Sequence, residues 1–263
     1  MFETVRSRLR AALGLKRVWL AVLVLAAAAA ALLEILTADH EKMLVLSTMA
    51  PGQTGETHAA LALFSQAYSS DPIVFSGRVA TLRRLRQGGK PNSWECAWIV
   101  WNYQDNDHFY YLALKPDGWE LGKRDPAYPG GQRFMATGSQ PFPVGAWTTF
   151  KVSQLENLIV VTADNRKLAS VIDTQPPIYT SGQIGLYTED AVAALARVTS
   201  PIVEDFRTYQ QQNTKVDGSA FGGWTLPFLG YGSAAIEPVS FPDEDESARQ
   251  PSAFSVSLPR RNQ

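Results

Sequence analysis

The segment from Ser93 to Asp125 concentrates aromatic, amide and charged side chains in a pattern that suits sugar binding. Strand alternation places Trp98 and Asn102 on one face of a strand, and Tyr111 is assigned to the same face on the next strand. A pyranose ring presents flat C–H patches that stack on an aromatic face. The predicted carbohydrate-binding residues are Trp98, Asn102, Tyr111, Glu120 and Arg133, the last two from neighbouring strands.

The face of Tyr111 is inferred from its neighbours in sequence. Tyr110, Leu112 and Leu114 form the more continuous apolar set, so they are predicted to point into the core. The register between strands rests on turn lengths, and a slip of one residue would reverse every face. The alternative is a sandwich in which both aromatic layers are buried.

A second candidate site is the hairpin turn that contains Asp105 and Asp107. Alternating carboxylates in such a turn could bind one hard cation, and calcium is the metal this pattern favours. Hairpin turns also select Asp and Asn for backbone reasons alone, which is the alternative interpretation. The three histidines lack zinc-site spacing, and the chain has no HExxH or CxxC motif, which argues against zinc chemistry.

Hydrolytic chemistry on a glycoside would require two convergent carboxyl groups. The candidates inside the predicted fold are Glu95, Glu120, Asp125 and Glu189, and no spacing selects a pair among them. The single cysteine, Cys96, lies within a strand near tryptophans, so we expect a small core residue rather than a nucleophile.

These side chains must be positioned by short strands, because the sequence alternates between β-branched or aromatic runs and turn residues. The predicted architecture is an all-β sandwich of two antiparallel sheets. The predicted strands are 73–85, 94–103, 108–114, 119–123, 133–137, 147–154, 158–163, 167–172, 182–187 and 193–198.

Several of these segments carry a family resemblance. The run WIVWNYQDNDHFYYLAL, the opening Gly145-Ala146-Trp147, the hairpin tip Ala163-Asp164-Asn165 and the strand 182–187 resemble the concanavalin A-like jelly-roll superfamily. Within it, the chain is most similar to the 3-keto-disaccharide hydrolase domain family, over residues 73–206. The resemblance implies a jelly-roll sandwich and, as activity, glycoside cleavage, although fold alone does not fix function.

Two departures weaken the enzymatic implication of that resemblance. Asn102 and Ala113 stand where many relatives have arginines. The ExDxxE strand motif of the related glucanases is also missing.

The N-terminal region predicts attachment to a membrane. Residues 1–17 are basic, and an apolar run follows that approaches the roughly 20 residues needed to span a bilayer. We therefore expect a transmembrane signal anchor over residues 18–38 in the inner membrane, with the basic segment 1–17 in the cytoplasm and the bulk of the chain, after the anchor, in the periplasm. The alternative is a cleaved signal peptide and secretion to the periplasm. The formal net charge of -1 argues against a nucleic-acid partner.

The remaining divisions follow from composition. Residues 39–72 are expected to be a linker with enough Ala and Leu for a short helix or strand, 73–206 the sandwich, and 207–263 a low-complexity, disordered tail. Within the tail, the run FGGWTLPFLGY at 221–231 is expected to dock on the protein's own surface rather than on a partner, and the acidic residues 243–246 to be a solvated spacer.

Three functional hypotheses remain open at this point. The first is a membrane-anchored carbohydrate-binding or accessory module of a polysaccharide system, with a glycan and a membrane protein of that system as partners. The second is a glycoside-cleaving enzyme. The third is a structural interaction domain without a sugar ligand.

Overall fold

A computed structural model describes residues 41–49, 56–68, 72–199, 202–209, 212–216, 218–227, 232–239 and 241. The described part of the chain is built almost wholly of strands, and its only helical element is a 3₁₀ turn, η1 (Pro129–Gly131). The predicted all-β class is confirmed.

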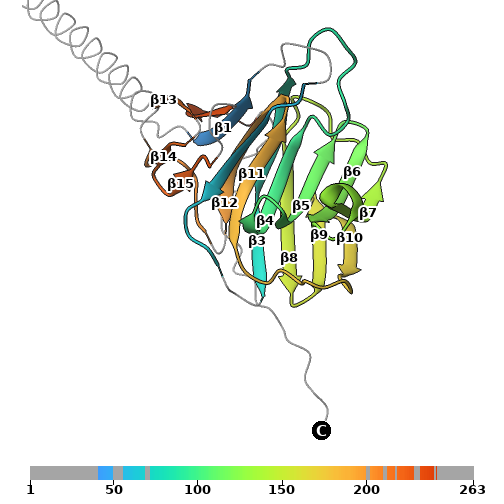
Figure 1. Ribbon diagram of the computed structural model, residues 1–263. Helices are drawn as coiled ribbons and strands as arrows, with labels where there is room; N and C mark the ends of the chain where they lie inside the picture. The colour runs from blue at the N-terminus through green and yellow to red at the C-terminus, as the bar shows by residue number, and fades with distance from the viewer. Residues whose placement is uncertain are drawn as a thin grey trace, which may run out of the picture. The chain divides into compact units, whose positions relative to one another are not determined.

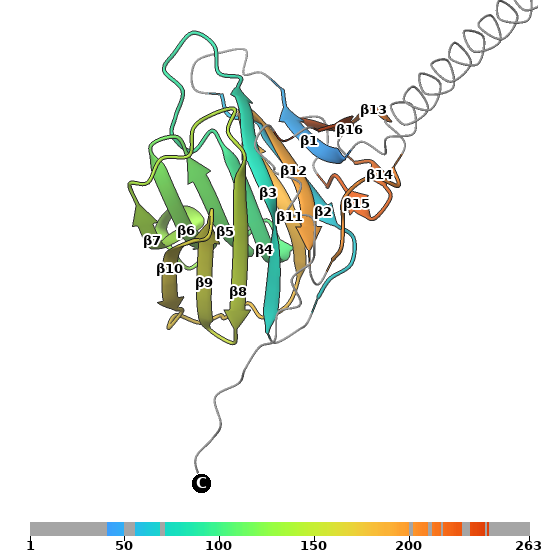
Figure 2. The same ribbon diagram turned by 180° about the vertical axis from the view of Figure 1, so that it is seen from behind.

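Two eight-stranded antiparallel sheets stack face to face, as the opposite views in Figures 1 and 2 show. Sheet A has the strand order β10-β9-β8-β3-β12-β1-β16-β13, and sheet B has the order β14-β15-β2-β11-β4-β5-β6-β7. The strands of sheet A are β10 (Arg166–Ile172), β9 (Leu158–Ala163), β8 (Thr148–Leu155), β3 (Ile73–Arg84), β12 (Ala191–Thr199), β1 (Lys42–Thr48), β16 (Gly232–Pro238) and β13 (Gln212–Val216). The strands of sheet B are β14 (Ala220–Phe221), β15 (Trp224–Thr225), β2 (Ala59–Phe64), β11 (Gln183–Glu189), β4 (Ala97–Asp105), β5 (His108–Lys115), β6 (Gly118–Arg124) and β7 (Gln132–Gly138).

The core lies between the two sheets and follows the period-2 alternation of the strands. Phe75 of β3 packs against Trp101 of β4 with ring centroids 6.2 Å apart, and against Phe150 of β8 at 5.8 Å. Tyr110 stacks on Trp101 at 5.6 Å. This aromatic layer fixes β4 and β5 against sheet A, so their other face is directed away from the core.

The sheets extend beyond the predicted interval 73–206 at both ends. Strands β1 and β2 come from the predicted linker, and β13 to β16 come from the predicted tail. The run AALALF of β2 is buried almost throughout, and a short buried strand cannot be distinguished from a short helix by periodicity. For residues 39–72 the structure has the strand alternative of the prediction, and for β13 to β16 the prediction of a disordered tail is corrected.

The glycine-rich segment in the tail packs on the sandwich, as the docking prediction requires. Trp224 is fully buried and pairs with Phe64 of β2, and its ring lies 5.7 Å from that of Phe206. Residues 228–231 of this segment lie outside the described part of the chain.

The predicted membrane segment, residues 18–38, also lies outside the described residues. Among the residues that are described, no helix is both long and apolar enough to cross a bilayer.

Candidate functional site

The outer face of sheet B carries the aromatic residues that the sequence assigned to sugar binding. Trp98 and Tyr111 belong to an apolar cluster on this face, whereas Tyr110, Leu112 and Leu114 point into the inter-sheet core. The predicted face assignment is therefore correct for both aromatic rings. They contact each other with centroids 4.8 Å apart.

Asn102 is a correction to the predicted site. Its backbone has a φ of 49°, and the pairing of β4 with β5 shifts register between Trp101 and Asp105. Such an irregularity changes which face the following side chains take. The buried amide of Asn102 donates to Gln154 Oε1 at 3.1 Å and to the Tyr179 carbonyl at 2.7 Å, away from the outer face. Tyr103 takes the outer-face position instead.

Arg133 is a second correction, because it points to the opposite side of β7. Its guanidinium forms an ion pair with Asp173 at 2.7 Å, beside the buried Lys123. Arg133 pairs in register with Lys123 of β6, and both side chains lie on the inner face of sheet B. The strand is correctly predicted but its alternation is off by one, so Gln132 lies on the outer face.

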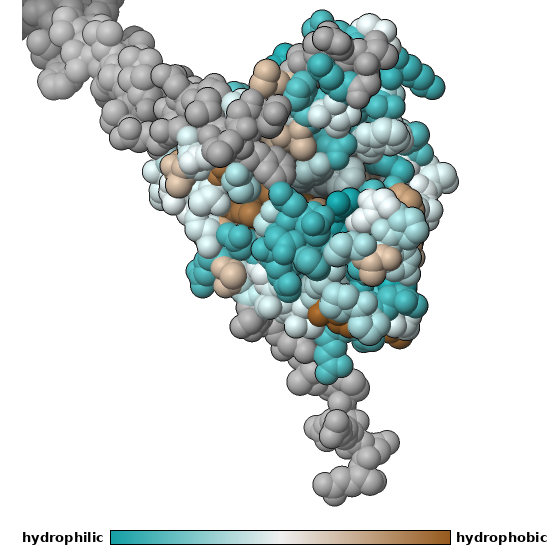
Figure 3. Space-filling view, viewed as in Figure 1, coloured by the Kyte–Doolittle hydropathy of each residue, from teal (hydrophilic) through white to brown (hydrophobic). Residues whose placement is uncertain are grey.

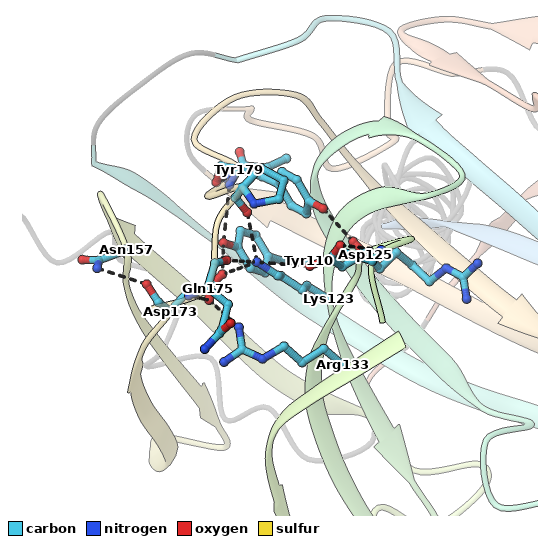
Figure 4. A network of polar contacts seen from close by, with 12 residues as sticks. Tyr110, Lys123, Asp125, Arg133, Asn157, Asp173, Gln175 and Tyr179 are labelled. Carbon is cyan, nitrogen blue, oxygen red and sulfur yellow. Dashed lines mark hydrogen bonds and ion pairs between the residues drawn. The ribbon is translucent and has the colours of Figure 1, made fainter. Parts of the chain in front are cut away.

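The polar network around Lys123 joins the two sheets at this edge (Figure 4). The fully buried ammonium donates to Asp173 Oδ2 at 2.8 Å and to the Pro177 carbonyl at 2.9 Å. Tyr110 Oη donates to the same Asp173 oxygen at 2.7 Å. Burial alone would raise the pKa of Asp173, but the hydrogen bonds from Lys123 and Tyr110 hold it below its ordinary value.

A pocket of about 260 Å³ opens on the outer face of sheet B. Figure 3, viewed from that side, shows apolar and strongly hydrophilic side chains next to each other on this face. The lining residues come from β2, β4, the turn after it, β5, β6, β7 and β11. They are Leu61, Trp98, Val100, Tyr103, Asn106, Phe109, Arg124, Gln132, Tyr187 and Glu189.

The aromatic walls of the pocket support one another. Trp98 meets Tyr187 edge to face at 5.2 Å, and Tyr103 packs on Phe109 at 5.4 Å. Tyr111 has no exposed surface and lies beneath these rings. Tyr111 therefore supports the pocket rather than offering a free stacking surface.

Gly122 of β6 provides the space that Tyr111 needs. The two residues are direct partners in the sheet, and a Cβ on Gly122 would lie 2.2 Å from Tyr111 Oη. The hydroxyl thus reaches over β6 toward β7. It donates to Glu120 Oε1 at 2.7 Å and accepts from Gln132 Nε2 at 2.6 Å.

Glu120 lies on the predicted face but is mostly enclosed. Its carboxylate accepts from Tyr111, from Lys115 Nζ at 3.3 Å and from Gln132 Nε2 at 3.3 Å. The structure thus brings together Trp98, Tyr111 and Glu120 out of the five predicted residues. Glu120 holds Gln132 in the pocket wall rather than lining the wall itself.

One carboxyl group and one guanidinium are among the side chains that line the pocket. Burial raises the pKa of Glu189, whose carboxylate accepts a hydrogen bond from Tyr187. Arg124 is anchored by Asp107 at 3.2 Å and by the Gly130 carbonyl at 3.2 Å. The Arg124 side chain is partly exposed and is one of the residues that line the pocket.

The carboxylates proposed for calcium have protein partners. Asp105 Oδ1 accepts from the Asp107 backbone N–H at 2.8 Å and lies 2.7 Å from His108 Nδ1, while Asp107 pairs with Arg124. This is the backbone role that a hairpin Asp commonly has. Within the described ranges, no group of three or more His, Cys, Asp or Glu side chains could hold a metal ion. Calcium binding here stays a prediction.

The other candidate carboxylates, Glu95 and Asp125, are not among the residues that line the pocket. Glu95 is fully buried beside Arg86, and Asp125 lies 3.9 Å from Lys123. Cys96 is buried, as expected for a core residue, and burial raises the pKa of its thiol.

Sequence reasoning missed most of the polar lining. Asn106, Arg124 and Gln132 become neighbours only through the pairing of β4 to β7, and no motif marks them. Arg124 and Gln132 are direct partners on β6 and β7, so a correct register for β7 would have identified both.

Comparisons with known proteins address the fold. No family model and no curated protein matches the chain. Among solved structures it is similar to the carbohydrate-binding module CBM66 from Bacillus subtilis, with 16% identity, a TM-score of 0.44, and coverage of 59% of this chain and 93% of that one. A galectin-like protein of unknown function from Bacillus subtilis gives 9% identity, a TM-score of 0.41, and 59% and 86% coverage. A human galectin-16 variant gives 12% identity and a TM-score of 0.36, with coverage of 57% of this chain and 99% of that one.

At such identities and TM-scores we draw no functional conclusion from these similarities. The two-sheet antiparallel architecture confirms the sandwich that the concanavalin A-like resemblance implies. The narrower resemblance to 3-keto-disaccharide hydrolase domains stays a prediction.

Proposed function

We propose that the protein binds a carbohydrate in the pocket on the outer face of sheet B. The observation that carries the proposal is the lining, in which four aromatic side chains share a space of about 260 Å³ with two carboxamides, a guanidinium and a carboxyl group. Sugars combine apolar ring faces with hydroxyl groups, so they match walls of this mixed kind.

The carboxamides have hydrogen-bonding groups available for a ligand. Asn106 Oδ1 accepts from Tyr103 Oη at 2.7 Å, and burial raises the pKa of Tyr103 to about 12, so the phenol keeps its proton and donates. In the described part of the chain, no partner is found for Asn106 Nδ2. Gln132 donates twice to Tyr111 and Glu120, which leaves its Oε1 as an acceptor. A donor and an acceptor at the rim suit sugar hydroxyls, which can act as both.

The pocket volume favours a small ligand. About 260 Å³ lies just below the roughly 300 to 1,000 Å³ of most small-molecule sites. We therefore infer that the pocket takes one sugar ring, either free or at the end of a chain.

Glycoside cleavage is the second candidate, and Glu189 is the observation that favours it. Because burial raises the pKa of Glu189, this carboxyl group would retain a proton to a higher pH and could act as an acid. Glu189 is nevertheless the only carboxyl group in the described lining, and the usual mechanism needs two. Binding without cleavage is therefore the better supported function. Release of reducing sugar by the parent chain, abolished in Glu189→Gln, would favour the enzyme instead.

We also propose that residues 18–38 anchor the chain in the inner membrane with the sandwich in the periplasm, next to a membrane protein of a polysaccharide system. The support is the basic flank followed by the long apolar run. If the sandwich is in the periplasm, an alkaline phosphatase fused after Gln263 should be active, and a fluorescent protein fused at the same position should not fluoresce. The reverse pattern would contradict this orientation. Carbonate washing then distinguishes an anchor, which stays in the membrane pellet, from a cleaved signal peptide.

The binding proposal is tested with the full chain on a glycan array, followed by calorimetry with the glycan that binds best. Asn106→Ala and Gln132→Ala should each weaken binding by about 0.5 to 1.5 kcal/mol, because each removes one neutral hydrogen-bonding group. Gln104→Ala is the matched control, since Gln104 is exposed on the same hairpin but does not line the pocket. If all three variants bound the glycan with the affinity of the parent chain, the binding site would not be this pocket.

A further inference from the structure

The outer face of sheet A differs from that of sheet B in its charge. The five neighbouring strands β10, β9, β8, β3 and β12 contain no Asp or Glu, although the sequence as a whole is nearly balanced. Their charged residues are all basic. They are Arg78, Arg83, Arg84, Lys151, Arg166, Lys167 and Arg197.

Two exposed lysines lie on the outward side of these strands. Lys151 of β8 and Lys167 of β10 both pair in register with Thr162 of β9, so the two side chains share one face. Neither lysine has an ion-pair partner among the described residues. Like charges on one face raise its potential and favour an anionic partner.

The chain itself approaches this face after β16. The ring of Phe241 lies 3.9 Å from the guanidinium carbon of Arg78 and 4.5 Å from that of Arg197. Trp147 meets the same ring edge to face at 5.1 Å. The electron-rich face of an aromatic ring attracts a guanidinium, so these contacts hold Phe241 beside the basic face.

The sequence places four consecutive acidic residues immediately beyond this point, Asp243, Glu244, Asp245 and Glu246. An extended chain advances about 3.3 to 3.6 Å per residue, so the acidic run can reach from roughly 7 Å to roughly 18 Å beyond Phe241.

The lysines lie within this reach. Arg78 pairs with Thr149, and Lys151 lies two residues further along β8, which puts it about 8 Å from Arg78 across the sheet. Lys167 lies two strands beyond Lys151, which adds about 10 Å. The spacing of the acidic residues thus matches that of the lysines.

We propose that the outer face of sheet A is a docking surface for the chain's own acidic run, residues 243–246, with Phe241 as its anchor. The docked run neutralises Lys151 and Lys167 and keeps other polyanions off this face. The surface is opposite the pocket of sheet B, so this inference does not depend on sugar binding.

The test is lysine acetylation of the full chain with sulfo-NHS acetate, followed site by site with mass spectrometry. The test variant carries D243N, E244Q, D245N and E246Q. In this variant Lys151 and Lys167 should be acetylated at least about threefold faster than in the parent. Each surface ion pair contributes little by itself, but several pairs together protect the two lysines measurably. Lys90, exposed in the loop before β4, is the internal control and should keep its rate.

Phe241→Ala keeps all four acidic residues but removes the anchor, so it should expose the same two lysines. At about 1 M salt, charges are screened beyond about 3 Å. The acetylation rates of Lys151 and Lys167 should then be the same in the parent and in the variant with the four neutralised residues. Equal rates in the parent and the neutralised variant at low salt would overturn the proposal. Protection that grows with protein concentration would assign the run to a second copy and would also overturn it.

Discussion

Gly122→Ala provides a specific test of how the pocket is supported. The added methyl group would lie 2.2 Å from Tyr111 Oη, 2.4 Å from Tyr111 Cζ and 2.7 Å from the Arg133 carbonyl oxygen. The tyrosine ring cannot move aside, because it is fully buried and packs against Trp98 at 4.8 Å and Phe109 at 6.4 Å. Either the ring or the β6–β7 pairing must shift.

The expected cost has two parts. Overpacking a filled site costs about 1 to 3 kcal/mol. Displacing the hydroxyl also disturbs its hydrogen bond to Glu120, a bond to a charged acceptor worth about 1.5 to 3 kcal/mol. Because the two effects overlap, we expect Gly122→Ala to lower the free energy of unfolding by about 2 to 4 kcal/mol.

Urea denaturation of parent and variant measures this difference. Gly89→Ala is the matched control, because a Cβ there would meet nothing within 4 Å and Gly89 does not have a positive φ. It should change stability by less than about 0.5 kcal/mol. A Gly122→Ala variant as stable as Gly89→Ala would refute the packing of Tyr111 over β6. The variant should also weaken glycan binding, since Gln132 loses the hydroxyl that orients it.

Three further predictions concern the buried network and the hairpin turn. Lys123→Met should destabilise the protein by about 3 to 5 kcal/mol in denaturation experiments, because it leaves the buried Asp173 without its main partner. Since the pKa of Asp173 is lowered in the folded state, its stabilising contribution is present above the unfolded value of about 3.9 and is lost as pH falls through the folded value. Asp173→Asn should therefore flatten the acid limb of a stability-versus-pH curve, and an unchanged slope below about pH 4 would contradict this assignment. Calcium at Asp105 and Asp107 predicts a higher melting temperature with the ion than with a chelator, and equal melting temperatures would dismiss the site.

The parts of the fold that the sequence predicts well are those governed by alternation. Tyr110, Leu112 and Leu114 form a regular apolar series, so the core face of β5 and the outward face of Tyr111 follow directly. The hairpin turns at 104–107 and 115–118 also follow from their Asp, Asn, Pro and Gly content.

The errors come from local irregularities that no pattern reveals. The positive φ of Asn102 and the register shift beside it reverse alternation at the end of β4, which takes the amide into the interior and brings Tyr103 to the pocket. Another register shift separates Leu121 from Gly122 in the pairing of β6 with β7, near the misassigned Arg133. A shift of one residue is enough to change the face that a side chain takes. Both shifts therefore gave a predicted site residue, Asn102 or Arg133, the wrong face.

Burial is the other quantity that the sequence could not supply. An aromatic side chain on an outward face is expected to be available for stacking, yet Tyr111 is completely covered and Trp98 is only 6% exposed. Substituting either ring by Ala is therefore expected to cost about 3 to 5 kcal/mol of stability, so neither variant separates binding from folding. The exposed amide of Asn106 and the half-buried amide of Gln132 are better probes.

The measurement that tests the central claim most directly is calorimetry of the full chain with the best ligand from a glycan array, comparing Gln132→Ala with Gln104→Ala. If the pocket on sheet B is the binding site, Gln132→Ala binds about two- to tenfold more weakly, whereas Gln104→Ala binds like the parent. An array without any bound glycan, or a Gln132→Ala variant with parental affinity, would contradict carbohydrate binding in this pocket.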